Sequence, residues 1–257
     1  MKIAIYQMEV IPGNPDKNIE KIKKWMQTLE NIDIAVLPEM WNTSYTLEQL
    51  QSITSKNGQR EIAALQQLAQ HFQIHIVAGS IAVKVKGSIY NRAVIINKDG
   101  EVIHQYDKVH LVPMLNEPAY LTPRQHISIF ELHNVKMGII ICYDLRFPEI
   151  ARQLTLSGIE VLFVVAQWPV ERIQQFEKLL YARAIENQLF VIACNTVGQC
   201  ENTVFGGQSM IINPLGDSVT QMLEGEGTIT ATIDLNEVRE IRRAIPLLTT
   251  RREDLYS

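Results

Sequence analysis

Cys142 follows an apolar run, residues 135–141 (VKMGIII), and opens directly into a turn of charged and bulky residues, 143–149 (YDLRFPE). A strand that fits the interior of a sheet and delivers one thiol to a polar edge is an arrangement that presents a nucleophile. In open α/β sheets, ligands bind outside the carboxyl ends of the strands, where this thiol is expected. The alternative is a core cysteine, because free cysteine is among the most buried residue types.

Two charged residues, Glu39 and Lys108, occupy equivalent places at the ends of other predicted strands. Glu39 follows the apolar segment 34–37, and Lys108 follows the segment 101–106. Each could be a solvated surface group, which is the more common role of a charged residue after a strand. Together with Cys142 they supply a base, a fixed cation and a nucleophile. Acyl transfer from an amide needs these three, because the attacking species is a thiolate that a base or a nearby cation must generate.

Three longer motifs contain these residues and follow one another along the chain. They are LPEMW around Glu39, YDKVHL around Lys108 and GIIICYDLRFPE around Cys142. In all three the sequence resembles the carbon–nitrogen hydrolase (nitrilase) superfamily, as it does in the later segment AQWPVERIQQFEKLLYARAIENQLFVIACNTVG and in the ending RREDLY. The resemblance covers essentially the whole chain. It implies an α/β fold, the nitrilase-like α-β-β-α sandwich, as a single domain over residues 1–257.

The resemblance also implies a role for each residue that matches a family motif. Glu39 would be the general base, Lys108 the cation that stabilises the transition state, and Cys142 the nucleophile. Glu117 matches a second family glutamate that helps to hold the site. The backbone N–H of Tyr143 would join Lys108 in binding the oxyanion, and removing one such donor typically costs about 3–4 kcal/mol in the rate.

Within the superfamily the chain looks most like the omega-amidase branch, which hydrolyses 2-oxoglutaramate and related 2-oxo acid amides. The stretch 166–169 (AQWP) and the short, single-domain length favour this branch. The implied reaction splits the terminal amide of a small carboxylic or 2-oxo acid into acid and ammonia through a thioester on Cys142. Two alternatives stay open: a nitrile or N-carbamoyl amine hydrolase of the same superfamily, and a non-catalytic dimeric binding protein.

Six residues near the three motifs are candidates for the wall of a substrate pocket. They are Trp41, Tyr45, Met114, Arg146, Trp168 and Arg172. Ordinary packing is the alternative for the aromatic ones, since large aromatic side chains are mostly buried. Arg172 is predicted in the first turn of a helix, where the helix dipole disfavours a cation. We therefore expect its guanidinium to reach an anion, either a nearby glutamate or a substrate carboxylate.

Composition and charge exclude several other classes of protein. The 257 residues carry a net charge of −4, which gives no basic surface for nucleic acid or an anionic membrane. No uninterrupted apolar segment approaches about 18 residues, so no membrane span is predicted. Three cysteines form no CxxC pair and six histidines form no HExxH motif, so we expect no disulfide framework, metal site or cofactor. Reduced thiols and the lack of a signal peptide favour a soluble cytoplasmic protein that acts on a small-molecule amide.

Short apolar runs predict strands, and several are continuous, as expected of strands covered on both faces. The runs are residues 3–7, 34–37, 74–79, 93–97, 135–141, 161–166, 190–195, 209–213 and 228–233. Helical spacing of apolar residues predicts helices over 19–29, 62–72 and 173–184. Turn residues at 97–100 and 213–217 predict two hairpins.

Three smaller predictions concern local contacts and assembly. Asn91 and Arg92 resemble the family's strand that packs beside the site; we expect them in the turn that enters a strand, and a functional role is the alternative. Arg183 and Glu186 are expected to form an intrahelical pair. The family resemblance suggests a homodimer, in which the helix of this pair and the helix after the nucleophile pack against a second subunit. The C-terminal tail, from about 244 to 257, would reach across that interface.

Overall fold

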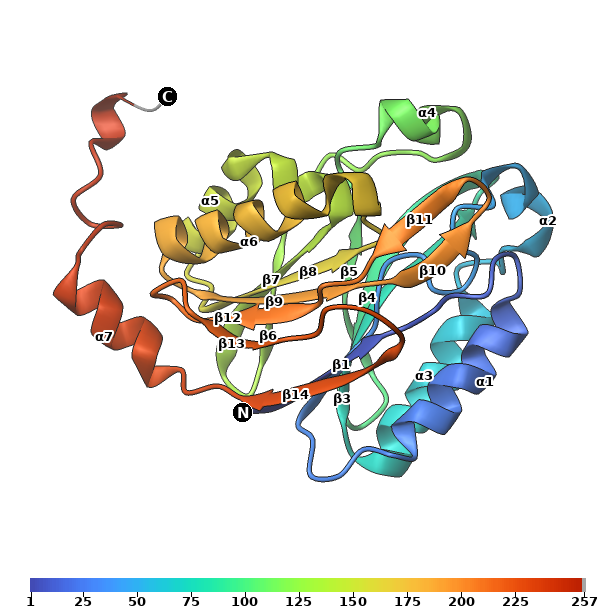
Figure 1. The fold of residues 1–257 in the computed structure, drawn as a ribbon, viewed down its shortest axis with the longest axis horizontal. Coiled ribbons are helices and arrows are strands. Elements are labelled where there is room, and N and C mark those ends of the chain that lie inside the picture. The colour runs from blue at the N-terminus through green and yellow to red at the C-terminus, as the bar shows by residue number, and fades with distance from the viewer. Residues whose placement is uncertain (256–257) are drawn as a thin grey trace.

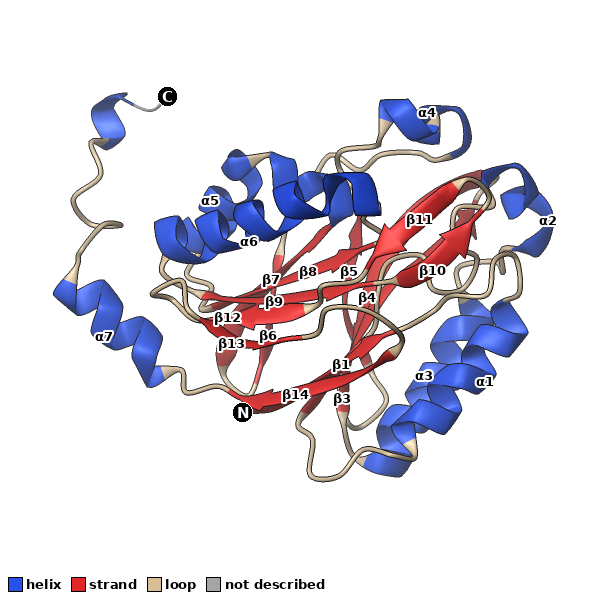
Figure 2. Ribbon diagram, in the orientation of Figure 1, coloured by secondary structure: helices blue, strands red, loops and turns tan. Residues whose placement is uncertain are grey.

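The computed structural model describes residues 1–255 as two six-stranded β-sheets packed face to face, with helices on both outer faces (Figures 1 and 2). Helices α1 (Pro15–Met26) and α3 (Gln59–Phe72) cover the outer face of one sheet. Helices α5 (Pro148–Leu156) and α6 (Ile173–Asn187) cover the outer face of the other. The predicted α-β-β-α sandwich is therefore confirmed.

The first sheet has the strand order β14-β1-β2-β3-β4-β5. Its strands are β1 (Lys2–Gln7), β2 (Ile34–Val36), β3 (His75–Val85), β4 (Ser88–Ile96), β5 (Val102–Asp107) and β14 (Gly227–Thr232). Strands β1, β2 and β3 run parallel, and the other pairings are antiparallel. Parallel neighbours need long crossover connections, which α1 and α3 supply.

The second sheet has the order β13-β12-β9-β8-β7-β6. Its strands are β6 (Ile129–Leu132), β7 (Val135–Ile141), β8 (Val161–Ala166), β9 (Phe190–Asn195), β12 (Met210–Ile212) and β13 (Ser218–Gln221). Here β7, β8 and β9 run parallel, with α5 and α6 as their crossovers.

Shorter elements complete the chain outside the two sheets. A separate hairpin pairs β10 (Val197–Cys200) with β11 (Thr203–Gly206). The remaining helices are α2 (Leu50–Ile53), α4 (Glu117–Tyr120) and α7 (Asn236–Ala244), and 3₁₀ turns cover Leu47–Gln49, Pro113–Leu115, Cys142–Arg146, Val170–Arg172 and Glu253–Leu255.

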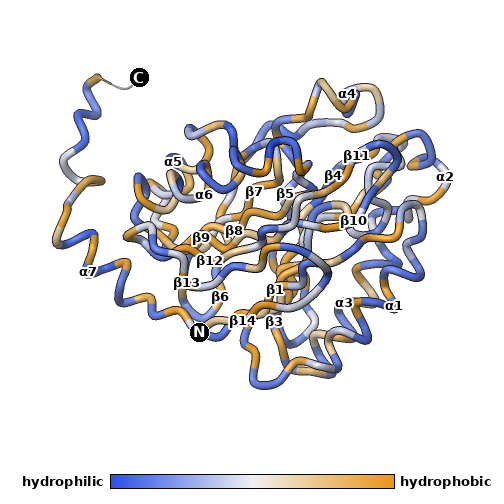
Figure 3. The backbone as a smooth tube through the Cα atoms, viewed as in Figure 1, coloured by the Kyte–Doolittle hydropathy of each residue, from blue (hydrophilic) through white to orange (hydrophobic). Residues whose placement is uncertain are grey.

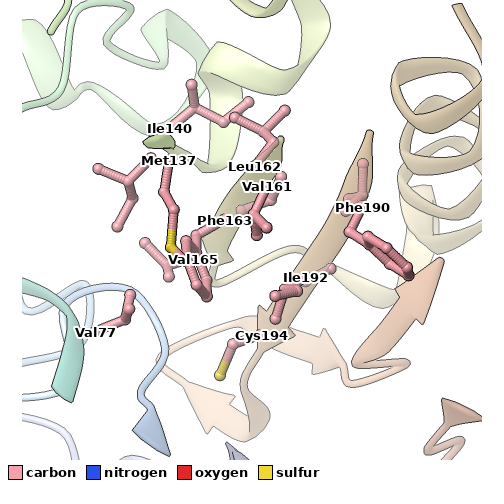
Figure 4. Packing of buried hydrophobic residues seen from close by; sticks show 14 of the residues in the cluster. Val77, Met137, Ile140, Val161, Leu162, Phe163, Val165, Phe190, Ile192 and Cys194 are labelled. Carbon is pink, nitrogen blue, oxygen red and sulfur yellow. The ribbon is translucent and has the colours of Figure 1, made fainter. Parts of the chain in front are cut away.

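The strands are apolar on both faces because each side chain meets one of two hydrophobic layers. In β1, Ile3 and Ile5 belong to the layer between the sheets, whereas Ala4 and Tyr6 pack in the layer under α1 and α3. This alternation is the two-residue period of a strand. Figure 4 shows part of this packing, with labelled residues from β3, β7, β8 and β9. Along the backbone, hydrophobic segments therefore gather in the sheets, while the helices alternate with the polarity of their two faces (Figure 3).

The strand predictions are confirmed in position, with differences at the ends. Strand β3 runs on to Val85, six residues beyond its predicted end at Gly79. Strands β6, β10 and β11 were not predicted, because four-residue segments carry too little periodicity to be recognised. Both hairpins and all three helices are confirmed. The helical pair is also confirmed, with Arg183 Nη1 2.8 Å from Glu186 Oε1.

One glycine, Gly79, allows strand β3 to pass close to the segment that follows β2. Gly79 has φ +55°, and a Cβ built on it would lie 1.9 Å from the carbonyl oxygen of Pro38. Any other residue would collide with the segment that follows β2. Glycine alone tolerates both this conformation and this close approach. The backbone of β3 can therefore pass directly beside the turn that carries Glu39.

Candidate active site

A buried ion-pair cluster lies where the strands of both sheets end. Lys108 follows β5, and its Nζ lies 2.9 Å from Glu39 Oε1 and 2.8 Å from Glu117 Oε1. The side chains of all three residues are 0 % exposed. Glu39 follows β2, and Glu117 begins the short helix α4. Two carboxylates thus hold one ammonium in a fixed position away from water.

Tyr45 joins the two carboxylates from the other side. Its hydroxyl lies 3.0 Å from Glu39 Oε1 and 2.7 Å from Glu117 Oε1. Lys108 Nζ also lies 3.4 Å from the Tyr45 hydroxyl. Burial and the carboxylates of Glu117 and Glu39 raise the pKa of Tyr45 well above its ordinary value. The phenol therefore stays protonated and donates its hydrogen bond to the carboxylate pair.

The same carboxylates fix the charge of the lysine. Burial by itself lowers the pKa of Lys108, but the negative charges of Glu117 and Glu39 outweigh burial, and the net pKa lies above the ordinary lysine value. An opposite charge at hydrogen-bond distance favours the ionised form, which is the physical cause of the rise. Lys108 is therefore a permanent cation rather than a proton donor at neutral pH.

The third sequence motif places Cys142 beside this cluster. Cys142 begins the 3₁₀ turn after β7, has φ +47° and is 5 % exposed. Burial raises the pKa of the Cys142 thiol well above its ordinary value, and the Glu39 carboxylate raises it further, while Lys108 acts in the opposite direction. At rest the sulfur is thus a neutral thiol beside a carboxylate that can accept its proton.

Asp144 holds the turn that presents the thiol. Its Oδ2 accepts hydrogen bonds from the Tyr106 hydroxyl at 2.7 Å and from Ile141 N at 3.1 Å. Its Oδ1 lies 2.9 Å from both His110 N and His110 Nδ1. Tyr106 and His110 flank Lys108 in sequence. The buried Asp144 carboxylate therefore connects the segment that carries Lys108 to the turn that carries Cys142. This network was not predicted from the sequence.

Two amide side chains fix the orientation of Glu39. Gln167 donates its backbone N–H to Glu39 Oε2 at 2.8 Å, and its Nε2 donates to the Glu39 carbonyl oxygen at 2.7 Å. Asn91 Nδ2 donates to Glu39 Oε1 at 2.9 Å. The prediction of a strand-entry turn for Asn91 is wrong: the residue lies inside β4 and is 1 % exposed. Gln167 was missed, although it directly follows β8 and so obeys the same strand-end rule as the charged residues.

A small cavity opens over the thiol. Its lining includes Cys142 and Tyr143 together with four of the predicted pocket residues, Met114, Arg146, Trp168 and Arg172. Its volume is about 30 Å³, close to the share of one water molecule in the liquid. A larger ligand must displace a lining side chain, and the 59 % exposed side chain of Met114 has room to move.

Both predicted pocket arginines, Arg146 and Arg172, line this cavity. The Arg146 guanidinium lies 4.6 Å from the Trp168 ring centroid, an arrangement in which the ring face attracts the cation. Neither Arg146 nor Arg172 forms an ion pair within residues 1–255, so the expected glutamate partner of Arg172 is not found there. Both cations are therefore available to an anionic ligand.

The pocket prediction for Trp41 is wrong. Trp41 is 0 % exposed and packs in the hydrophobic layer under α1 and α3. Its indole N–H donates to the carbonyl oxygen of Ala78 at 2.8 Å. Because the backbone at Met40 has φ +45°, the chain turns sharply after Glu39, and the two neighbouring side chains leave in different directions.

In the part of the chain that the structure describes, no group of three or more His, Cys, Asp or Glu side chains is arranged to hold a metal ion. No described helix has the length and apolar character that crossing a membrane requires.

Comparison with known proteins places this arrangement in a family. The family model described as "Carbon-nitrogen hydrolase" matches residues 2–243. The chain belongs to the carbon–nitrogen hydrolase family. A Staphylococcus aureus relative named "Hydrolase in agr operon" is 42 % identical over 260 residues, covering 100 % of both chains. A Bacillus subtilis relative named "2-oxoglutaramate amidase" is 40 % identical, covering 99 % of this chain and 98 % of that one.

A solved structure supports the same assignment. The protein XC1258 from Xanthomonas campestris, a CN-hydrolase superfamily protein with an arsenic adduct in its active site, superposes with a TM-score of 0.92. It is 26 % identical to this chain, and the match covers 98 % of this chain and 97 % of that one. Membership of the carbon–nitrogen hydrolase family thus agrees with the observed fold and with the three sequence motifs.

Proposed function

We propose that the protein hydrolyses the terminal amide of a small 2-oxo acid, such as 2-oxoglutaramate, to the acid and ammonia, with Cys142 as nucleophile. One observation carries the proposal: the buried Cys142 lines a cavity beside Glu39, whose carboxylate is fixed by Lys108 at 2.9 Å. Buried charges are costly unless they are paired, and even a paired cluster is often less stable than an apolar core. A use in catalysis accounts for keeping the cluster.

In the first step Glu39 accepts the thiol proton as Cys142 Sγ attacks the amide carbon. The carbonyl oxygen becomes an oxyanion, which the Lys108 ammonium and the backbone N–H of Tyr143 stabilise. Tyr143 is the second residue of a 3₁₀ turn, where N–H groups have no partner inside the turn. The carbon–nitrogen bond then breaks, Glu39 returns its proton to the nitrogen, and ammonia leaves a thioester on Cys142.

In the second step water replaces the sulfur. Glu39 accepts a proton from water as the oxygen attacks the thioester carbon, and the same donors bind the second oxyanion. The carbon–sulfur bond breaks, the thiolate takes the proton back from Glu39, and the acid leaves. Glu117 does not touch the thiol in this scheme; it holds Lys108, and it accepts a hydrogen bond from Val112 N at 2.7 Å that anchors its loop.

The substrate class follows from the charge of the cavity. Arg146 and Arg172 line it and offer two guanidinium groups to a carboxylate at the far end of a short substrate. Guanidinium binds carboxylates in a bidentate geometry, which selects acids over neutral amides. The relative named 2-oxoglutaramate amidase supports this choice.

The direct test is ammonia release from 2-oxoglutaramate, 2-oxosuccinamate, glutamine, asparagine, a simple nitrile and an N-carbamoyl amine, assayed side by side. We expect the 2-oxo acid amides to give the highest kcat/KM. Cys142→Ala abolishes ammonia release, whereas Cys194→Ala, which alters a buried thiol of β9 outside the site, keeps it. Carbon dioxide released with the ammonia would instead indicate a carbamoyl amine hydrolase, and turnover by Cys142→Ala would end the proposal.

The arginine assignment has a separate test with a built-in control. Arg172→Gln and Arg146→Gln should raise KM for 2-oxoglutaramate more than for an uncharged amide of similar length. Equal effects on both substrates would contradict carboxylate binding at these residues.

We further propose that the protein works as a homodimer in the cytoplasm. The tail after α7 runs away from the body of the molecule (Figure 1) and exposes Ile245, Leu247 and Leu255 by 51 %, 42 % and 64 %. Residues Tyr256 and Ser257, also part of the predicted interface, lie outside the described residues. The free cysteines fit a reducing compartment. Light scattering should give twice 29.3 kDa for the full chain and the mass of a monomer after truncation at residue 244. A monomer in both cases would refute the dimer.

A further inference from the structure

A second cavity borders the ion-pair cluster at Tyr45 and shares Leu115 with the cavity over the thiol. Its volume is about 190 Å³, and it is lined by Tyr45, Leu47, Glu48, Leu115, Asn116, Tyr120, Cys200, Glu201 and Thr203. Three segments far apart in sequence form it: the 3₁₀ turn before α2, the α4 loop and the β10–β11 hairpin. Figure 1 shows these segments gathered at the same end of the molecule.

The two cavities carry opposite charges. The cavity over Cys142 is lined by Arg146 and Arg172 and by no carboxylate. The second cavity is lined by Glu48 and Glu201 and by no cation. An anionic substrate or product is therefore favoured on one side of the cluster, and a cationic product is favoured on the other.

Two residues connect the second cavity to the reacting groups. Leu115 lines both cavities, so they meet at this side chain. Tyr45 forms part of the wall, and its hydroxyl contacts Glu39 and Glu117 directly, at 3.0 and 2.7 Å. Tyr45 thus connects the wall of the second cavity to the Glu39 carboxylate, and Leu115 is shared by the two cavities.

We propose that the second cavity is the route by which ammonia leaves and water enters, while the acid enters and leaves over Cys142. The proposal rests on the proposed amidase function. After the carbon–nitrogen bond breaks, ammonia carries away the proton that Glu39 took from the thiol, and the acyl group stays on sulfur and fills the first cavity. A separate route lets ammonia depart and water arrive without passing the bound acyl group. At the mouth ammonia takes a proton from solvent, and the resulting ammonium faces Glu48 and Glu201.

The sharpest test blocks the second cavity with a tryptophan on the hairpin. Thr203→Trp places a bulky side chain into the lining of this cavity, whereas Val204→Trp points to the opposite face of β11, where Val204 lines a different hollow. Side chains alternate along a strand, so the two variants differ only in the face that they obstruct. Thermal melting and alkylation of one Cys142 thiol per chain establish that each variant is folded.

The kinetic signature follows from the order of steps. Escape of ammonia and entry of water both come after the carbon–nitrogen bond breaks. Entry of water follows the loss of ammonia, so blocking it lowers kcat and KM in proportion and leaves kcat/KM unchanged. The acyl thioester on Cys142 also accumulates in the steady state, as intact-protein mass spectrometry detects. We expect this pattern for Thr203→Trp, and wild-type values for Val204→Trp.

Other outcomes overturn the proposal. A raised KM with lowered kcat/KM for Thr203→Trp would make the second cavity a path for the acid substrate, and wild-type kinetics would make it an inert hollow. If Thr203→Trp does not fold, Glu48→Trp blocks the same mouth and Glu48→Gln removes only the charge. Both glutamates are exposed and partly screened by salt, so Glu48→Gln should lower kcat less than the tryptophan variant does. Failure of the proposed function is distinct, because the wild-type protein would then release no ammonia from any amide.

Discussion

Replacing Asp144 by Asn tests how the molecule holds its nucleophile. The Asp144 carboxylate accepts hydrogen bonds from the buried backbone N–H of Ile141 and the partly buried one of His110, through different oxygens. An amide has one acceptor oxygen, so in either orientation one backbone N–H loses its acceptor. An unsatisfied buried group costs about 1–3 kcal/mol, and the charge-assisted bonds that become neutral lose a further amount of about 1 kcal/mol. We expect Asp144→Asn to lower the free energy of unfolding by about 2–4 kcal/mol.

The activity should fall as well, because the turn that relaxes is the one that carries Cys142. Its φ of +47° is a conformation that costs a non-glycine residue about 1–3 kcal/mol and persists only when its surroundings enforce it. Misplacement of the sulfur by about 1 Å can cost about a hundredfold in rate. The expected result is a large loss of kcat in molecules that remain folded.

The assay combines urea unfolding with steady-state ammonia release. Asp217→Asn is the matched control, since Asp217 is exposed and accepts one side-chain hydrogen bond, from Asn213 at 3.2 Å; it should change stability by less than about 0.5 kcal/mol. The reasoning is refuted if Asp144→Asn matches this control in stability, or if its kcat equals that of the wild type.

Three further predictions concern charge and backbone. Glu39→Gln should abolish turnover yet shift the alkylation of Cys142 by iodoacetamide to lower pH, because burial and then the Glu39 charge hold the thiol pKa up while Lys108 lowers it; an unchanged pH profile would contradict this. Burial raises the pKa of Cys142 and Cys194, so the folded chain keeps protons that the unfolded chain releases. The free energy of unfolding should therefore decline as pH rises above about 8.5, which urea midpoints measured from pH 7 to 10 will test. Gly79→Ala should lose at least about 3 kcal/mol of stability through its overlap with the Pro38 carbonyl oxygen; a wild-type melting curve would show that β3 can move aside.

The part of the site that the sequence predicts is the part governed by strand ends. Glu39, Lys108 and Cys142 each follow a strand, and the carboxyl ends of those strands meet at one edge. Gln167 follows the same rule, but a neutral amide after a strand carries no chemical signal of its own. Its importance depends on contacts with Glu39 across 128 positions of the chain, which no local pattern encodes.

Other features depend on the three-dimensional path of the chain. Tyr45, expected as a pocket wall, lines the second cavity, and it also bridges two carboxylates because the loop after Glu39 turns back over the cluster. Trp41 was expected in the pocket, but a positive φ at Met40 sends its indole into the core. A sequence shows which side chains lie near a motif, whereas loop dihedral angles decide where they point.

The most direct measurement of the mechanism is mass spectrometry of the protein quenched during turnover of 2-oxoglutaramate, followed by peptide mapping. The account predicts a single adduct, with the mass of the substrate less ammonia, on the peptide that contains Cys142, and none in Cys142→Ala. An adduct on a different residue, or rapid ammonia release by a chain that never carries an adduct and is insensitive to Cys142→Ala, would contradict it.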